Sequence, residues 1–204
     1  MPAPVVDPDE PWSGRVNGPP IDGLTWVPLP RHEDHRGWFT KVFQRSAMAV
    51  RGEGDDPTEV AEVYLSGSAR GVVRGLHFQS PPHDHAKTVA CTAGAVLDVV
   101  VDLRCGSPTE GAVATFRLDG ARPGRLHLVP GLAHGFQALA PNSTMVYVVS
   151  SEHAPDHDDG VRFDSVGVTW PIDPVSVSDR DAAFAPLDAF RSPFTYRAGS
   201  GDGS

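Results

Sequence analysis

The side chains best suited to proton chemistry lie between residues 71 and 87, which read GVVRGLHFQSPPHDHAK. Residues 71–78 are typical of a β-strand, and a strand gives each side chain a fixed direction. His77 lies on this strand, and an imidazole can accept a proton near neutral pH. Arg74 precedes it and Lys87 follows it, so both could attract an anionic substrate. The stretch predicts a proton-transfer site, with a structural histidine beside a surface loop as the alternative.

The strand pattern also predicts which of these residues share a face. Alternate residues of a strand point the same way, so Val73, Gly75 and His77 are expected on one face. Arg74 is then expected on the other face. The chain turns after the strand, at the two prolines 81 and 82, before it reaches the cluster at 83–87.

The strongest strand pattern is at 95–103, where apolar residues occupy both faces. Asp98 and Asp102 interrupt one of these faces. A buried carboxylate is unfavourable unless it is paired, so each acid is expected to have a partner. Asp98 has a structural and a functional interpretation, which the sequence leaves open.

Short apolar runs separated by Gly and Pro continue along the chain and predict further strands. These lie at 24–29, 38–43, 59–65, 88–92, 113–118, 125–129, 136–140 and 145–150. A turn is expected at 32–37, and short helices at 46–50 and at 180–183, the second one capped at 178–179. Many short strands with such turns predict an all-β sandwich or jelly-roll barrel.

The composition limits the class of protein. The 204 residues suit one domain, and a net charge of −9 argues against binding nucleic acid. No apolar run predicts a membrane span, and the first residues do not resemble a secretory signal. Cys91 and Cys105 are expected to be buried and reduced, as in a cytoplasmic protein. A disordered leader is predicted at 1–20, one domain at 21–196 and a disordered tail at 197–204.

Eight motifs occur in order along the chain. They are RGWF at 36–39, GVVRGLHFQSPP at 71–82, AK at 86–87, LDVVVDLRCGSPT at 97–109, VPGLAHGFQAL at 129–139, VYVVSSEHAP at 146–155, WP at 170–171 and SDRDA at 178–182. Together, over about residues 24–190, they resemble the dTDP-4-dehydrorhamnose 3,5-epimerase family. The resemblance implies a cupin-type jelly-roll barrel with short peripheral helices, usually a homodimer, with no cofactor and no metal.

The resemblance also implies a reaction, the epimerisation of a dTDP-linked 4-keto-6-deoxyhexose at C3, C5 or both. Protons at these carbons are acidic because each carbon lies beside the C4 ketone. By motif position His77 is the base and Asp181 is the carboxylate that orients it. Lys87 matches the residue that stabilises the enolate, and Tyr147 matches the acid on the opposite face.

Other matching positions imply contacts with the nucleotide sugar. The residues expected to bind substrate are Arg36, Phe39, Arg74, His134 and His153. The two arginines match positions that hold the diphosphate, which a guanidinium binds through paired hydrogen bonds. His134 is expected in a turn that lines the pocket near the sugar.

The chain departs from the family at several positions on the nucleotide side. Lys41 stands where relatives commonly have Glu, and Glu62 and Tyr64 stand where they have Gln and Asn. Lys41 and Glu62 could form an ion pair, which would change the hydrogen bonds offered to the base. His153 replaces a frequent Tyr and offers less area for stacking. These departures leave the nucleotide and the epimerised carbon open.

Two other functions remain as alternatives. A metal-dependent cupin oxygenase could use His83, His85 and His134 as ligands. The carboxylate that such a cupin has three or four residues after its His83–His85 pair is missing. Lys87 would also place a positive charge beside the metal. The second alternative is a non-catalytic protein that binds sugar nucleotides, because a fold alone does not establish activity.

Overall fold

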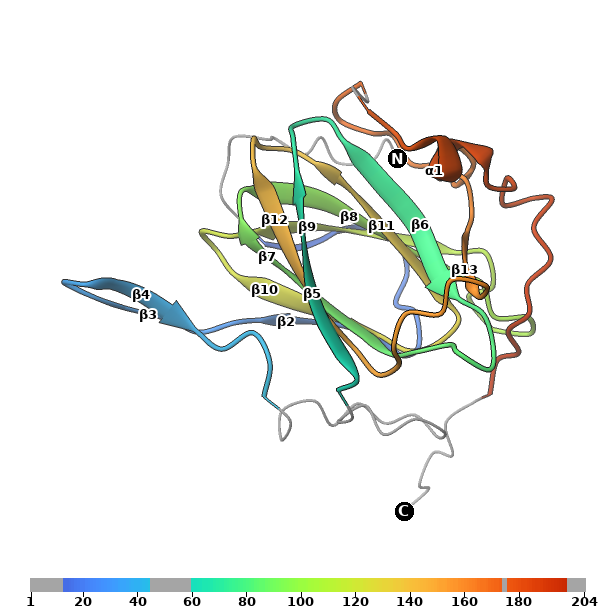
Figure 1. Ribbon diagram of the computed structural model, residues 1–204, viewed down its shortest axis with the longest axis horizontal. Coiled ribbons are helices and arrows are strands. Elements are labelled where there is room, and N and C mark those ends of the chain that lie inside the picture. The colour runs from blue at the N-terminus through green and yellow to red at the C-terminus, as the bar shows by residue number, and fades with distance from the viewer. Residues whose placement is uncertain (1–12, 45–59, 174–175, 198–204) are drawn as a thin grey trace, which may run out of the picture.

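The computed structural model of the protein describes residues 13–44, 60–173 and 176–197. Two antiparallel sheets lie face to face (Figure 1). In order across the larger sheet lie β1 (Gly14–Asn17), β9 (Val113–Asp119), β8 (Ala95–Asp102), β11 (Leu132–Ala138), β6 (Val73–Gln79) and β13 (Asp158–Gly160). The smaller sheet contains β2 (Leu24–Pro28), β10 (Gly124–Leu128), β7 (Lys87–Ala93), β12 (Ser143–Val149) and β5 (Glu62–Ser68). This arrangement confirms the predicted all-β jelly-roll class.

Both faces of the six-stranded sheet are covered, which explains why apolar residues occupy both faces of β8. Val96 and Val100 face the five-stranded sheet and join a core that includes Leu126 and Met145 of that sheet. Leu97 and Val99 face outward into a second apolar cluster, which contains Phe194 of the C-terminal segment. A strand that is buried on both sides has no polar face to present to water.

Strand β6 contains an irregularity that decides the geometry of the pocket. His77 pairs with His134 of β11, and Arg74 pairs with Phe136, so three steps along β6 match two along β11. Gly75 lies in this bulge with φ +115°, and a Cβ there would come within 2.6 Å of the Gly135 backbone. Only glycine fits such a close approach of two strands.

The bulge corrects one prediction from the sequence. Arg74 and His77 were expected on opposite faces of the strand, but both line the same pocket. The extra residue shifts the alternation by one position, so an odd spacing now places two side chains on one face.

Four further predictions need correction. The predicted leader 1–20 is wrong for Gly14–Asn17, since β1 pairs with β9; residues 1–12 lie outside the described part. The predicted turn 32–37 is mostly hairpin, made of β3 (Arg31–Asp34) and β4 (Gly37–Thr40).

His134 lies inside β11, paired on both sides, and not in a turn. Cys91 is buried but Cys105 is exposed; both thiols are free.

Two other predictions fall largely or wholly outside the described residues. They are the helix at 46–50 and most of the tail at 197–204. In the described part, no helix is long and apolar enough to cross a membrane.

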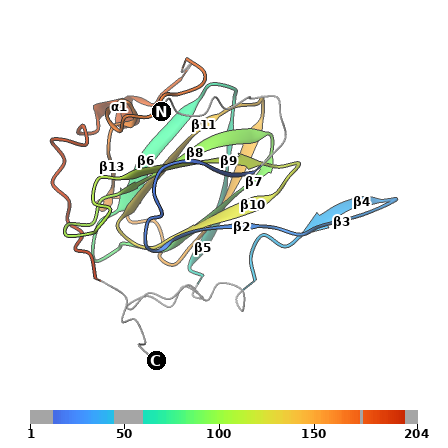
Figure 2. The ribbon, with the colours of Figure 1, turned by 180° about the vertical axis from the view of Figure 1, so that it is seen from behind.

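The β3–β4 hairpin projects away from the sandwich, as Figures 1 and 2 show from opposite sides. It carries Trp38 and Phe39, whose exposed fractions are 49% and 55%. Large aromatic side chains are normally buried, so this hairpin presents an apolar surface without a cover in the single chain.

The C-terminal region packs against the six-stranded sheet. It includes a 3-10 helix, η2 (Phe163–Ser165), and one short α-helix, α1 (Asp179–Ala183). The predicted cap is confirmed, because the Ser178 side chain accepts a hydrogen bond from the Asp181 backbone N–H. Arg180 ties α1 to β13, where it donates to the Asp158 backbone oxygen and pairs with its carboxylate, both at 2.9 Å.

Candidate active site

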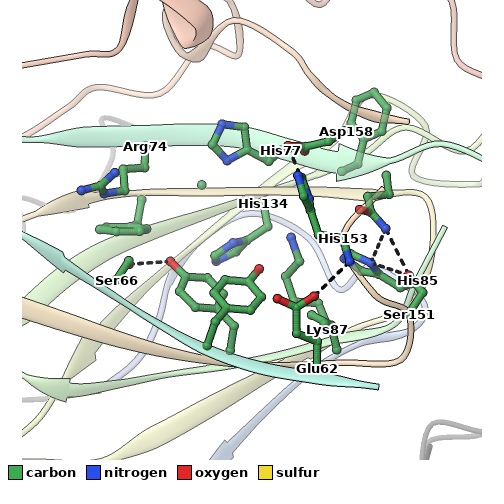
Figure 3. Close-up of a pocket in the computed structure, with 17 residues that line it drawn as sticks. Glu62, Ser66, Arg74, His77, His85, Lys87, His134, Ser151, His153 and Asp158 are labelled. Carbon is green, nitrogen blue, oxygen red and sulfur yellow. Dashed lines mark hydrogen bonds and ion pairs between the residues drawn. The ribbon is translucent and has the colours of Figure 1, made fainter. Parts of the chain in front are cut away.

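A cavity of about 430 Å³ opens between the two sheets, beside their edge strands β5 and β13. The six-stranded sheet contributes Arg74 and His77 from β6 and His134 from β11. The five-stranded sheet contributes Tyr64, Lys87 and Tyr147 from β5, β7 and β12. Figure 3 shows His77 on one side of the cavity and Lys87 on the other. Titratable side chains of different chemistry therefore face each other across one space.

His77 is held by the carboxylate of Asp181, which lies on α1. Its Nε2 is 2.9 Å from Asp181 Oδ1, and Asp181 Oδ2 accepts the Gly75 backbone N–H at 3.0 Å. Burial raises the pKa of Asp181, but the hydrogen bonds from His77, Gly75 and Ser178 outweigh it and keep this pKa below its ordinary value. An ionised carboxylate only accepts, so the imidazole proton is on Nε2 and Nδ1 is left as a base.

His77 is still open to the pocket, with a side chain that is 30% exposed. Phe184, just after α1, meets its ring edge to face at 5.7 Å between centroids. The aromatic wall and the Asp181 carboxylate together set the orientation of the imidazole.

Lys87 begins β7 and is buried within the pocket. Burial lowers the pKa of Lys87 to about 8, although the nearby Asp158 and Asp98 carboxylates act in the opposite direction. The charged amine thus lies in a poorly hydrated place, where it interacts strongly with any negative charge that develops on a ligand.

Tyr147 lies on β12, in the wall opposite His77. Its hydroxyl is 3.1 Å from Ser66 Oγ, and its ring stacks on Tyr64 at 4.5 Å between centroids. Burial raises the pKa of Tyr147 well above its ordinary value, and the neighbouring Tyr64 and Asp98 add to this effect. The phenol therefore keeps its proton near neutral pH and can supply it as an acid.

His134 forms a second histidine–carboxylate pair in the pocket wall. Its Nε2 is 2.7 Å from Asp98 Oδ2. Burial raises the pKa of Asp98, whereas the charges of His134 and Lys87 partly offset this. Asp98 thus has a partner for one of its two carboxylate oxygens, and it stands behind His134 without lining the pocket itself.

One end of the pocket is lined by Glu62, His153 and Asp158. Glu62 accepts a hydrogen bond from the His153 backbone N–H at 2.9 Å, and the His153 ring is 4.0 Å from the Asp158 carboxylate. Figure 3 shows both contacts. Within the described residues, the Lys41–Glu62 ion pair suggested by the sequence does not form, because Glu62 is turned towards His153.

Arg74 has its guanidinium held by Ser68 Oγ and the Gly67 carbonyl oxygen, at 3.0 Å each. These contacts come from the edge strand β5 and orient the Arg74 side chain at the pocket. A fixed guanidinium suits a diphosphate.

The structure does not bring Arg36 and Phe39 to the pocket of their own chain. Both lie on the projecting hairpin, and Arg36 pairs with Asp34 while its side chain is 78% exposed. Within a single chain, the structure therefore does not place these two residues where they could contact a substrate in the pocket.

The ligands proposed for a metal-dependent oxygenase are not gathered together. The His83 ring lies against the His157 ring, with 4.5 Å between the ring centroids. His85 is hydrogen-bonded to Gln79, and His134 is hydrogen-bonded to Asp98. In the described part of the chain, no three His, Cys, Asp or Glu side chains are arranged to hold a metal ion.

Several residues of the pocket were not identified from the sequence. They are Ser66, Phe78, Gln79, Gly135, Phe136, Val149, Ser151 and Asp158. His85, which the sequence suggested only as a metal ligand, also lines the pocket. Gln79 and Ser66 each follow a recognised site residue by two positions on a strand, a signal that could have found them. Asp158 had no such signal, because its strand has only three residues.

Comparisons with known proteins agree with this geometry. The family described as dTDP-4-dehydrorhamnose 3,5-epimerase matches residues 19–189. An enzyme of that name from Streptomyces griseus is 44% identical over 155 residues, 73% of this chain and 76% of its own length.

Solved structures give the same likeness. ChmJ, a 3'-monoepimerase from Streptomyces bikiniensis solved with dTDP-quinovose, is 35% identical with a TM-score of 0.74, over 82% of this chain and 85% of its own. RmlC from Legionella pneumophila, a dTDP-6-deoxy-D-glucose-3,5-epimerase solved with dTDP-4-keto-L-rhamnose, is 28% identical with a TM-score of 0.79, over 92% and 100%.

Proposed function

This chain belongs to the dTDP-4-dehydrorhamnose 3,5-epimerase family, and on that premise we propose that it epimerises a dTDP-linked 4-keto-6-deoxyhexose in deoxysugar biosynthesis. One observation supports the reaction most directly. A histidine held by an ionised carboxylate faces a protonated tyrosine and a buried lysine across one cavity. Inversion at a carbon beside a ketone requires such a base and acid on opposite sides.

In the first step, His77 Nδ1 removes the proton at C3 or C5 of the sugar. Asp181 stabilises the resulting imidazolium through the hydrogen bond to Nε2. The electron pair moves to the C4 oxygen, and the buried ammonium of Lys87 stabilises that enolate oxygen. The low hydration that lowers the pKa of Lys87 also strengthens this contact.

In the second step, Tyr147 donates its hydroxyl proton to the other face of the same carbon. The high pKa of Tyr147 keeps the donor protonated until the enolate carbon accepts the proton. Proposed binding contacts complete the site: Arg74 holds the diphosphate, His134 lines the sugar pocket, and His153 lies on the nucleotide side. No cofactor takes part in these steps, and a cytoplasmic location stays a prediction.

We further propose a homodimer in which the projecting hairpin reaches a partner. Arg36 and Phe39 can meet substrate only in another chain's pocket, because their own lies away from the hairpin. The edge strand β5 also exposes Val63 and Leu65, by 59% and 66%. Two exposed apolar surfaces on one chain are typical of a self-association interface.

The reaction is tested by proton NMR of the purified protein with dTDP-4-keto-6-deoxyglucose in D2O. We expect deuterium at C3, C5 or both, with loss of this exchange in His77→Asn. The positions that exchange identify the epimerised carbon. A folded protein that binds dTDP but exchanges no proton of this or related nucleotide sugars is a binding protein, and the proposed reaction is then wrong.

The dimer is tested by mixing two inactive variants. Arg36→Ala retains its own His77, and His77→Asn retains its Arg36, so a mixed dimer has one complete pocket if hairpins are exchanged. We expect activity to reappear on mixing and on exchange of subunits. If the mixture is dimeric but has only the summed activity of the two separate variants, each pocket uses the residues of its own chain alone.

A further inference from the structure

The proposed acid Tyr147 is held at two points by the edge strand β5. Tyr64 is its direct partner in the β5–β12 ladder, and the two rings lie nearly parallel, 4.5 Å apart at 12°. Ser66, two residues further on the same face of β5, bonds to the Tyr147 hydroxyl at 3.1 Å. One contact therefore holds the ring and the other holds the hydroxyl.

The remaining side of Tyr147 leaves its ring little freedom. His134 meets it nearly perpendicularly at 6.2 Å between centroids. A tyrosine has only two side-chain torsions, and a stacked ring on one side with a perpendicular ring on another restricts both. Without Tyr64, the space beside the Tyr147 ring would open towards the pocket mouth, since Tyr64 is itself 37% exposed.

We propose that Tyr64 is a positioning residue, which holds the Tyr147 hydroxyl where it can deliver a proton to the face opposite His77. This inference rests on the proposed epimerisation and adds a specific residue to it. Tyr64 acts through its ring and not through its hydroxyl, because the contact with Tyr147 is a stack. Proton transfer is sensitive to displacements of about 1 Å, so a loosened donor slows inversion.

The two half-reactions separate this role from a general effect on folding. Removal of a proton by His77 and its return by the same histidine exchanges deuterium with retention, and this path does not use Tyr147. Inversion needs Tyr147. Loss of Tyr64 should therefore lower inversion while exchange with retention continues, whereas a smaller folded fraction lowers both rates equally.

The experiment compares Tyr64→Leu with Tyr64→Phe, using dTDP-4-keto-6-deoxyglucose in D2O and the NMR signals of both epimers. We expect Tyr64→Phe to keep the wild-type ratio of inversion to exchange, and Tyr64→Leu to lower it by about tenfold or more. Tyr196→Leu, the same change outside the pocket near Asp22, is the matched control and should leave the ratio unchanged.

A double-mutant cycle with Tyr147→Phe tests the route of the effect. If Tyr64 acts through Tyr147, Tyr64→Leu changes the inversion rate little once Tyr147→Phe is present. The positioning role is overturned if the two substitutions lower the inversion rate independently, so that their effects multiply. It is also overturned if Tyr64→Leu leaves the ratio of inversion to exchange unchanged. Because wild-type exchange is measured in the same series, absence of any exchange would count against the epimerase reaction itself and not against Tyr64 alone.

Discussion

The six-stranded wall of the pocket holds its proposed base by charge, whereas the five-stranded wall holds its proposed acid by burial and stacking. His77 is fixed by an ionised carboxylate that is itself held by a backbone N–H. Tyr147 is fixed by a second ring and by a neutral hydroxyl. A neighbouring negative charge favours the protonated form of a base, and burial favours the neutral form of an acid such as tyrosine. The difference explains how one small cavity can hold both.

The largest expected effect comes from the six-stranded wall, which holds His77 next to the Asp181 carboxylate. His77→Asn keeps a polar side chain near Asp181 but removes the base, so exchange and inversion should both fall by about 10³-fold, within the usual range for general base catalysis. Deuterium exchange followed by NMR measures both rates. Retained exchange at either carbon would mean that another group removes the proton and that the two walls have been assigned wrongly.

Tyr147→Phe tests the five-stranded wall and should separate the rate of deuterium exchange from the rate of inversion. The variant keeps the stack with Tyr64 but loses the proton donor, so inversion should fall by about 10²-fold while exchange with retention persists. Product stereochemistry read with the exchange rate gives the result. An equal fall in both rates would show that Tyr147 serves the first step as well.

Lys87, on the same five-stranded wall as Tyr147, predicts that the reaction rate depends on pH. Its pKa is lowered to about 8 by burial, so the amine loses its charge as the pH rises through 8, and kcat should fall there. Lys87→Arg, whose charge persists at higher pH, is the comparison: the alkaline fall should disappear from whatever activity it retains. An alkaline fall that is unchanged in this variant would assign the titration to another group.

The buried charge of Lys87 should also appear in stability. Its folded pKa lies below the unfolded value, so the unfolded chain binds more protons between about pH 8 and 10.5, and this group makes the fold relatively more stable as pH rises through that window. Below pH 8 the full penalty applies, about 3 kcal/mol for such a shift. Lys87→Met should therefore be more stable than wild type at pH 7 in urea unfolding, with the difference shrinking towards pH 10.5.

The contrast between the walls was only partly visible in the sequence. Short strands and their turns could be predicted because the apolar spacing and the Gly–Pro breaks are local. The four residues proposed for catalysis, His77, Asp181, Lys87 and Tyr147, could be named from motifs, and all four line or adjoin one pocket. The Tyr64 stack needs the β5–β12 register, which is a pairing between residues far apart in the chain.

The bulge at Gly75 and the position of the hairpin could not be predicted for the same physical reason. A bulge depends on how two strands meet, and the two glycines that permit it, Gly75 and Gly135, are 60 positions apart along the chain. The residues Arg36 and Phe39 have the side chains that a substrate site needs, but the path of β3 and β4 away from the sandwich decides which pocket they can reach.

The smallest expected effect tests whether His77 and Asp181 depend on the Arg180–Asp158 ion pair, which anchors α1 to β13. A helix of five residues is not stable alone, so α1 and its Asp181 rely on contacts such as the Arg180–Asp158 pair. This pair is partly exposed and is expected to contribute under about 1 kcal/mol to stability. Arg180→Ala should therefore lower exchange and inversion together by a few fold and leave their ratio unchanged, unlike Tyr64→Leu. Arg162→Ala, which breaks a similar pair with Asp164 away from the pocket, is the matched control. If Arg180→Ala instead changed the ratio of the two rates, the anchor of the base would also influence the acid, and the two walls would not act independently.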